Sequence, residues 1–230
     1  MESTLSFRRD GVILVCLHLF GLSYFALFLT YFLIFRYPAQ ADAISRNQGV
    51  IFYCGGAILW SLCSLVYRLI CIIYGNDARS RQKLEFAGTL LLIYTSAIPV
   101  LVLPSAIHIY ARSVCLLCLT VAMAQGMAEI IDTRDGPDSA RAFRRLCLWL
   151  GLLALMPVTY ILLHRAAGSS PLAFGLVRLT GLNLLGALLH LAGLPERCRL
   201  VGGWRPSLYV MHLMVIVNNL LYAQDVVNAL

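Results

Sequence analysis

The sequence has few charged residues for its length. Only 13% of its 230 residues are Asp, Glu, Lys or Arg, whereas 60% are hydrophobic, and the mean hydropathy is +0.80. A water-soluble domain of this length needs more polar surface than such a composition supplies. The composition therefore excludes a soluble globular protein and indicates an integral membrane protein.

The sequence also lacks low-complexity linkers and internal repeats, so we expect a single helical domain over residues 1–230. Most of its hydrophobic runs have a length close to that of a helix that crosses a bilayer, which is about 20 residues. Seven runs predict seven spans, although the short fifth run and Arg112 in the fourth leave six as an alternative. The predicted fold class is all-α, a polytopic seven-helix transmembrane bundle with spans at about 11–35, 49–74, 84–104, 106–131, 146–163, 171–193 and 206–224.

Basic residues are scarce on one side of this predicted bundle. The net charge is +7, but twelve of the 18 Lys and Arg residues fall at the N-terminus or in loops on its side of the membrane. They are Arg8, Arg9, Arg79, Arg81, Lys83, Arg134, Arg141, Arg144, Arg145, Arg197, Arg199 and Arg205. Only Arg36, Arg46 and Arg165 fall in the opposite loops, and three more arginines lie within spans.

Cytosolic loops of membrane proteins carry an excess of Lys and Arg. The distribution therefore predicts a cytosolic N-terminus and an exoplasmic C-terminus, in the plasma membrane or an endomembrane. It argues against a nucleic-acid partner, because the charge is explained by topology. The expected partners are membrane lipid and a lipid or protein effector; the sequence sets no oligomeric state.

Five ionisable residues fall inside or at the ends of the spans at similar depth. With about 1.5 Å of rise per residue, His18, Arg68 and His212 lie roughly 8–10 Å from the cytosolic ends of their spans. Glu85 opens the third span and His190 closes the sixth. Such groups usually pair or line a functional cavity. The alternatives are that the histidines and Arg68 reach the interface, and that Glu85 only favours a helix N-terminus.

The third span carries a recognisable pattern. The stretch "KLEFAGTLLLIYTSAIP", residues 83–99, resembles the third-span signature of the progestin and adipoQ receptor family, also called the hemolysin III family, which includes the adiponectin receptors. That signature reads approximately LDYxGIxLLIxxSxxP. The residues in register are Gly88, Leu91, Leu92, Ile93, Ser96 and Pro99.

Further motifs of the same family occur in the same order. "HLFG" at 18–21 is similar to HLLG of the first span, and "LPERCR" at 194–199 matches the PER segment before the last span. "SLVYR" resembles the second-span motif SxxYH, with Ser64 retained and Arg68 in place of the histidine. "SLYVMH" lines up with SHQIFH, so that His212 is kept and Leu208 replaces the first histidine. The resemblance covers nearly the whole chain.

The resemblance implies a seven-helix protein with a cytosolic N-terminus and, in intact members, a zinc centre. Three histidines hold the metal, the third-span aspartate holds its water, and the centre resembles that of ceramide-cleaving hydrolases. Zinc with three protein ligands keeps an open position and lowers the pKa of its water to about 7. Here only His212 of the three ligands remains, and Glu85 replaces the aspartate. Ser64 and Glu85 occupy positions equivalent to family catalytic residues.

Two functional hypotheses follow. In the first, Arg68 is a fixed cation paired with Glu85, no cofactor is bound, and the protein is a receptor-like or lipid-binding member that has lost the hydrolase site. In the second, a zinc-dependent ceramidase-like lipid amide hydrolase uses a rearranged set of His18, His190 and His212. A transporter or channel is the weakest alternative, because the polar residues are expected on one side of the membrane only.

Overall fold

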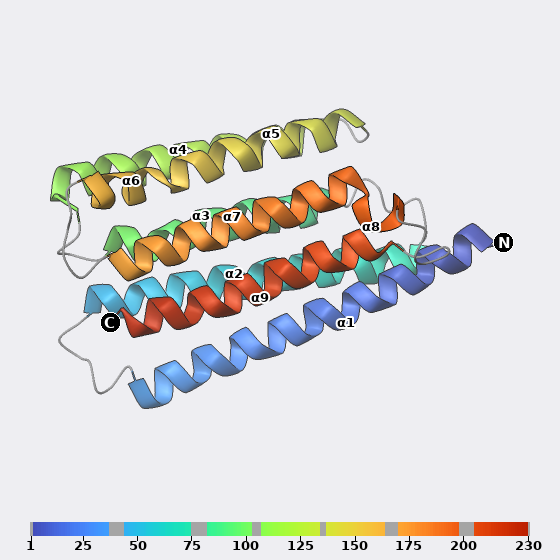
Figure 1. Ribbon diagram of the computed structural model, residues 1–230, viewed down its shortest axis with the longest axis horizontal. Helices are drawn as coiled ribbons and strands as arrows, with labels where there is room; N and C mark the ends of the chain where they lie inside the picture. Colours follow the sequence, from blue (N-terminus) through green and yellow to red (C-terminus); the bar gives the residue numbers. More distant parts are fainter. Residues whose placement is uncertain are drawn as a thin grey trace.

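The computed structural model describes residues 2–36, 44–74, 82–102, 107–133, 137–163, 170–197 and 205–229. These residues form a bundle of helices, seven of which are long and apolar enough to cross a membrane (Figure 1). The predicted fold class and the count of seven spans are therefore confirmed. The junction of the third and fourth predicted spans, at 103–106, lies outside the described residues, as do Arg79, Arg81, Arg134, Arg165 and Arg199.

The helices follow the predicted runs closely. Apart from the fifth span, the ends of the spans differ from prediction by a few residues. The elements are α1 (Glu2–Tyr31), which continues into a π-helical turn η1 (Phe32–Arg36), then α2 (Ile44–Tyr74), α3 (Gln82–Val102), α4 (Ile109–Asp132), α5 (Pro137–Ala154), α6 (Met156–Leu163), α7 (Ser170–Ala192), α8 (Leu194–Arg197) and α9 (Pro206–Asn228).

The fifth span is longer than predicted and is made of two helices. Its spanning part runs over Ser139–Leu163, so the expected start at residue 146 is wrong. The arginines at 141, 144 and 145 lower the local hydropathy, yet the helix continues because Phe143 stacks on Phe86 of α3, with ring centroids 3.9 Å apart. The span breaks between α5 and α6 because Pro157 has no N–H to donate to the preceding turn.

The third span lies at the centre of the bundle. Its apolar window is 61% buried, against 22% for the windows of α1 and α4. In Figure 1, α1 forms one edge of the bundle and α4, α5 and α6 form the opposite edge. Side chains of α3 are therefore the ones best placed to meet several other helices.

Glycines bring α2 and α3 unusually close together. A Cβ on Gly56 would lie 2.0 Å from Thr95 Oγ1, and a Cβ on Gly88 would lie 2.8 Å from the Cβ of Cys63. Both close approaches are possible only because glycine has no side chain. Together they fix the antiparallel register of the two helices. One to two turns further along in that register, Arg68 of α2 faces Glu85 of α3.

Candidate functional site

The centre of the candidate site is an ion pair between α2 and α3. Arg68 Nη2 lies 2.6 Å from Glu85 Oε1, and the two side chains are only 18% and 11% exposed. A guanidinium stays protonated in proteins, and its hydrogen bond to a carboxylate is charge-assisted. The pair therefore places a permanent positive charge, largely neutralised by one acid, inside the helical bundle.

His212 of α9 connects this pair to α1. Its Nε2 lies 3.5 Å from Arg68 Nη2, and its Nδ1 lies 3.2 Å from His18 Nε2. The guanidinium has only donors, so His212 Nε2 faces it as an acceptor and Nδ1 carries the ring proton. His212 then donates to His18 Nε2, which leaves the remaining proton on His18 Nδ1. Side chains from α1, α2, α3 and α9 thus meet in one polar cluster.

Four buried polar atoms of this region have no hydrogen-bond partner among the described residues. They are His18 Nδ1, Ser61 Oγ, Ser64 Oγ and Arg68 Nε. Ser61, Ser64 and Arg68 are three and four residues apart, so they share one face of α2. Buried polar groups normally have a partner, so this face has hydrogen-bonding capacity left for a polar group that enters the bundle.

His190 belongs to a separate contact at the start of α9. Ser207 donates both its hydroxyl, at 2.5 Å, and its backbone N–H, at 3.1 Å, to Glu196 Oε1. Because the hydroxyl has one proton, His190 Nδ1, 3.0 Å away, donates to Ser207 Oγ. Burial raises the pKa of Glu196, but the hydrogen bonds from Ser207 outweigh it, and the pKa lies below its usual value. His190 therefore joins α7, α8 and α9 and does not complete a set with His18 and His212.

Leu208, which the family resemblance aligns with a histidine, is half-buried in the first turn of α9. It lies four residues before His212, and residues at this spacing share a face of a helix. A histidine at 208 would therefore sit one turn from His212. A leucine at 208 offers no metal-ligand atom on that face and presents a branched apolar side chain instead.

The polar contacts of α9 continue towards its far end, and these contacts were not predicted from the sequence. Asn218, Asn219, Tyr222 and Asp225 all bond to other helices. Their partners are Asn183 at 3.1 Å, Tyr53 at 2.8 Å, the Ser96 carbonyl at 2.9 Å and Arg178 at 2.7 Å. The expectation that polar residues are confined to one side is wrong. The adjacent asparagines in "VIVNNLLY" were the available signal, and their bonds join helices.

The donor atoms of the cluster do not fit a resident zinc ion. One donor atom each of His18, Glu85 and His212 lie within 4.8 Å of one another, which is a spacing that a metal can use. However, the Arg68 guanidinium bonds to Glu85 and contacts His212. Each unit charge on a metal 4 Å from this cation would cost about 4 kcal/mol at an effective dielectric constant of 20. The donor set suits the ion pair better than a dication.

The fold and this cluster define a seven-helix membrane protein with a charged centre among α1, α2, α3 and α9. The sequence model of the haemolysin-III related family matches residues 10–222, and the chain belongs to this family. No curated protein matches the sequence. The family match begins at the start of the first span and ends at Tyr222 in the last, so it confirms the predicted family.

Proposed function

We propose that this protein is a receptor-like or lipid-binding member of the haemolysin-III related family whose zinc hydrolase site has been lost. The observation that supports this proposal is the 2.6 Å ion pair between Arg68 and Glu85, with His212 Nε2 3.5 Å from the same guanidinium nitrogen. The guanidinium holds a positive charge against the acid and the histidine that the family resemblance associates with zinc.

An arginine can replace the structural part of a metal site but not its chemistry. The ion pair joins α2 to α3 as a bound cation would, and it neutralises the buried carboxylate. A guanidinium has no open coordination position and does not generate hydroxide at neutral pH. The cluster therefore has the means to hold a polar group in place but not to hydrolyse an amide.

A lipid with a polar group that both donates and accepts hydrogen bonds suits the interior of the bundle. The hydroxyls of Ser61 and Ser64 and the Nδ1 of His18 are buried and without partners among the described side chains. An amide or hydroxyl at the head of a long-chain lipid would satisfy them. We propose this class of lipid as the ligand.

We also propose that this cluster lies near the cytosolic face. Lys83 and Arg205 lie at the starts of α3 and α9, and the first half of α5 carries Arg141, Arg144 and Arg145. These parts of the chain are at the end of the bundle where α1 begins. This charge distribution supports a cytosolic N-terminus. With this orientation, the cytosolic half of the membrane contains the cluster of His18, Arg68, Glu85 and His212.

The proposal is tested with purified protein in nanodiscs and a fluorescent ceramide as the probe. We expect saturable binding that a zinc chelator does not change, with no release of fatty acid. Ser64→Ala should weaken binding. Ser113→Ala, which alters an exposed serine whose hydroxyl donates to the Ile109 carbonyl of α4, should not. Release of fatty acid that is abolished by the chelator and by His212→Ala would favour the alternative, a zinc-dependent ceramidase-like hydrolase, with Glu85 in place of the predicted His190 beside His18 and His212.

A further inference from the structure

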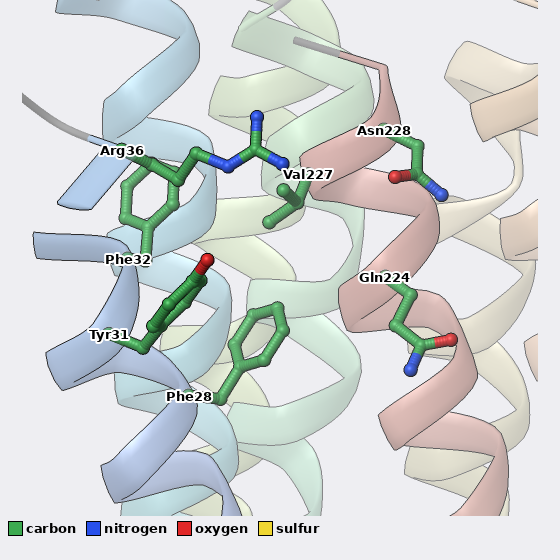
Figure 2. A pocket seen from close by; sticks show the side chains of 7 residues that line it. All are labelled: Phe28, Tyr31, Phe32, Arg36, Gln224, Val227 and Asn228. Carbon is green, nitrogen blue, oxygen red and sulfur yellow. The ribbon is translucent and has the colours of Figure 1, made fainter. Parts of the chain in front are cut away.

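A second polar feature lies at the opposite end of the bundle from the Arg68 cluster. A cavity of about 230 Å³ lies between two parts of the chain (Figure 2). One side is formed by the last turn of α1 together with η1, and the other side by the last turns of α9. It is lined by Phe28, Tyr31, Phe32 and Arg36 on one side and by Gln224 and Asn228 on the other. Arg36 is 18 residues beyond His18, roughly 27 Å along the helix, so this cavity is separate from the site described above.

The π-helical turn shapes this cavity. Its hydrogen bonds run from residue i to residue i+5, and it supplies Phe32 and Arg36 to the lining. Figure 2 shows the Arg36 side chain reaching from η1 towards Val227 of α9, above the rings of Tyr31 and Phe28. The cavity lining therefore combines one guanidinium with the aromatic side chains of Phe28, Tyr31 and Phe32.

Among the described residues, Arg36 is the only charged side chain that lines the cavity, and it forms no ion pair with any of them. Asp225, the acid in this part of α9, already pairs with Arg178 at 2.7 Å. Gln224 and Asn228 are exposed and offer amide donors and acceptors beside the cation. The lining therefore combines a positive charge that has no acidic partner among the described residues, two amides and apolar rings.

We propose that this cavity binds the head group of an anionic phospholipid. The guanidinium suits a phosphate, the amides suit the glycerol and ester oxygens, and the rings suit the first methylenes of an acyl chain. The ends of spanning helices lie at the level of the head groups, where aromatic side chains are enriched. A volume of about 230 Å³ equals that of about eight water molecules, which accommodates a head group and not a whole lipid.

The test is native mass spectrometry of the full-length protein in detergent, titrated with dioleoylphosphatidylglycerol. We expect one tightly retained lipid per chain, and about tenfold weaker binding in Arg36→Gln. Arg112→Gln is the matched control: it removes a half-buried arginine from the first turn of α4, at the same end of the bundle but outside the cavity. It should change the affinity less than about twofold.

Three results would overturn the proposal. These are equal loss of the lipid in the two arginine variants, equal retention of dioleoylphosphatidylcholine, and displacement of the lipid by an equal concentration of inorganic phosphate. The double variant Gln224→Ala with Asn228→Ala provides an independent measurement that leaves Arg36 intact. It should weaken retention about threefold, and unchanged retention would also contradict a head-group site.

Discussion

Arg68 and Glu85 form a largely buried ion pair between consecutive membrane spans, with Nη2 and Oε1 2.6 Å apart. The close contacts of Gly56 and Gly88 set the register of α2 and α3 that brings the pair together. His212 contacts both Arg68 and His18, and so connects the pair to α1. The pair accounts for a charged residue in the middle of an apolar segment.

The first prediction concerns the energy of the ion pair. Arg68→Leu and Glu85→Leu should each destabilise the protein by about 3–5 kcal/mol, because each leaves one buried charge unpaired. The double variant should cost clearly less than the sum of the two. The free energies of unfolding of all four proteins in one detergent measure this coupling. Strict additivity would show that the two side chains do not support each other.

The second prediction uses two adjacent glycines of α2. Gly56→Ala should destabilise the protein by about 1–3 kcal/mol, because its Cβ would overlap Thr95. Gly55→Ala is the matched control, since a Cβ there would meet no atom within 4 Å. It should be neutral or stabilising by up to about 1 kcal/mol, because alanine is the better helix former. Equal effects at the two positions would contradict the close packing of α2 on α3.

The third prediction is a pH dependence from Glu196, which lies outside the spans. Its pKa is lowered in the folded protein, so the ionised form adds stability above the unfolded carboxyl pKa of about 4.3. That stability is lost as the pH falls through the lower, folded pKa. Glu196→Gln should therefore reduce the Tm at pH 7, and the difference from wild type should shrink below about pH 4. A difference that stays constant from neutral to acidic pH would argue against an ionised Glu196.

The fourth prediction is the orientation of the chain. A glycosylation acceptor tag fused to the C-terminus should be modified in microsomes, and the same tag at the N-terminus should not. The reason is the excess of Lys and Arg at the end of the bundle where α1 begins. The opposite pattern of modification would place the Arg68 cluster near the exoplasmic face.

Hydropathy alone was sufficient to predict the bundle, because each run is close to the length that a bilayer requires. Hydropathy did not predict the start of α5, because arginines on one face of this helix lower the local hydropathy. The other face of the helix packs on α3 through Phe143. Depth along the spans correctly placed Arg68 and Glu85 near each other, since consecutive helices with a short connection must be neighbours.

Depth could not tell which way each histidine faces. His18 and His212 meet, but His190 at similar depth bonds to Ser207 instead, because Glu196 and Ser207 hold it at the start of α9. Rotation about a helix axis depends on tertiary packing, which a single sequence does not give. The same holds for Asn218 and Asn219, whose partners on α7 and α2 are distant in the sequence.

The central claim is that Arg68 replaces a metal ion at this site, and zinc content per chain tests it most directly. Wild-type protein purified in the presence of zinc and then dialysed should retain none, as measured by inductively coupled plasma mass spectrometry. The double variant Arg68→His with Leu208→His restores the ligand types that the family resemblance implies and should retain about one zinc per chain. Stoichiometric zinc in the wild type, lost in His212→Ala, would contradict the account.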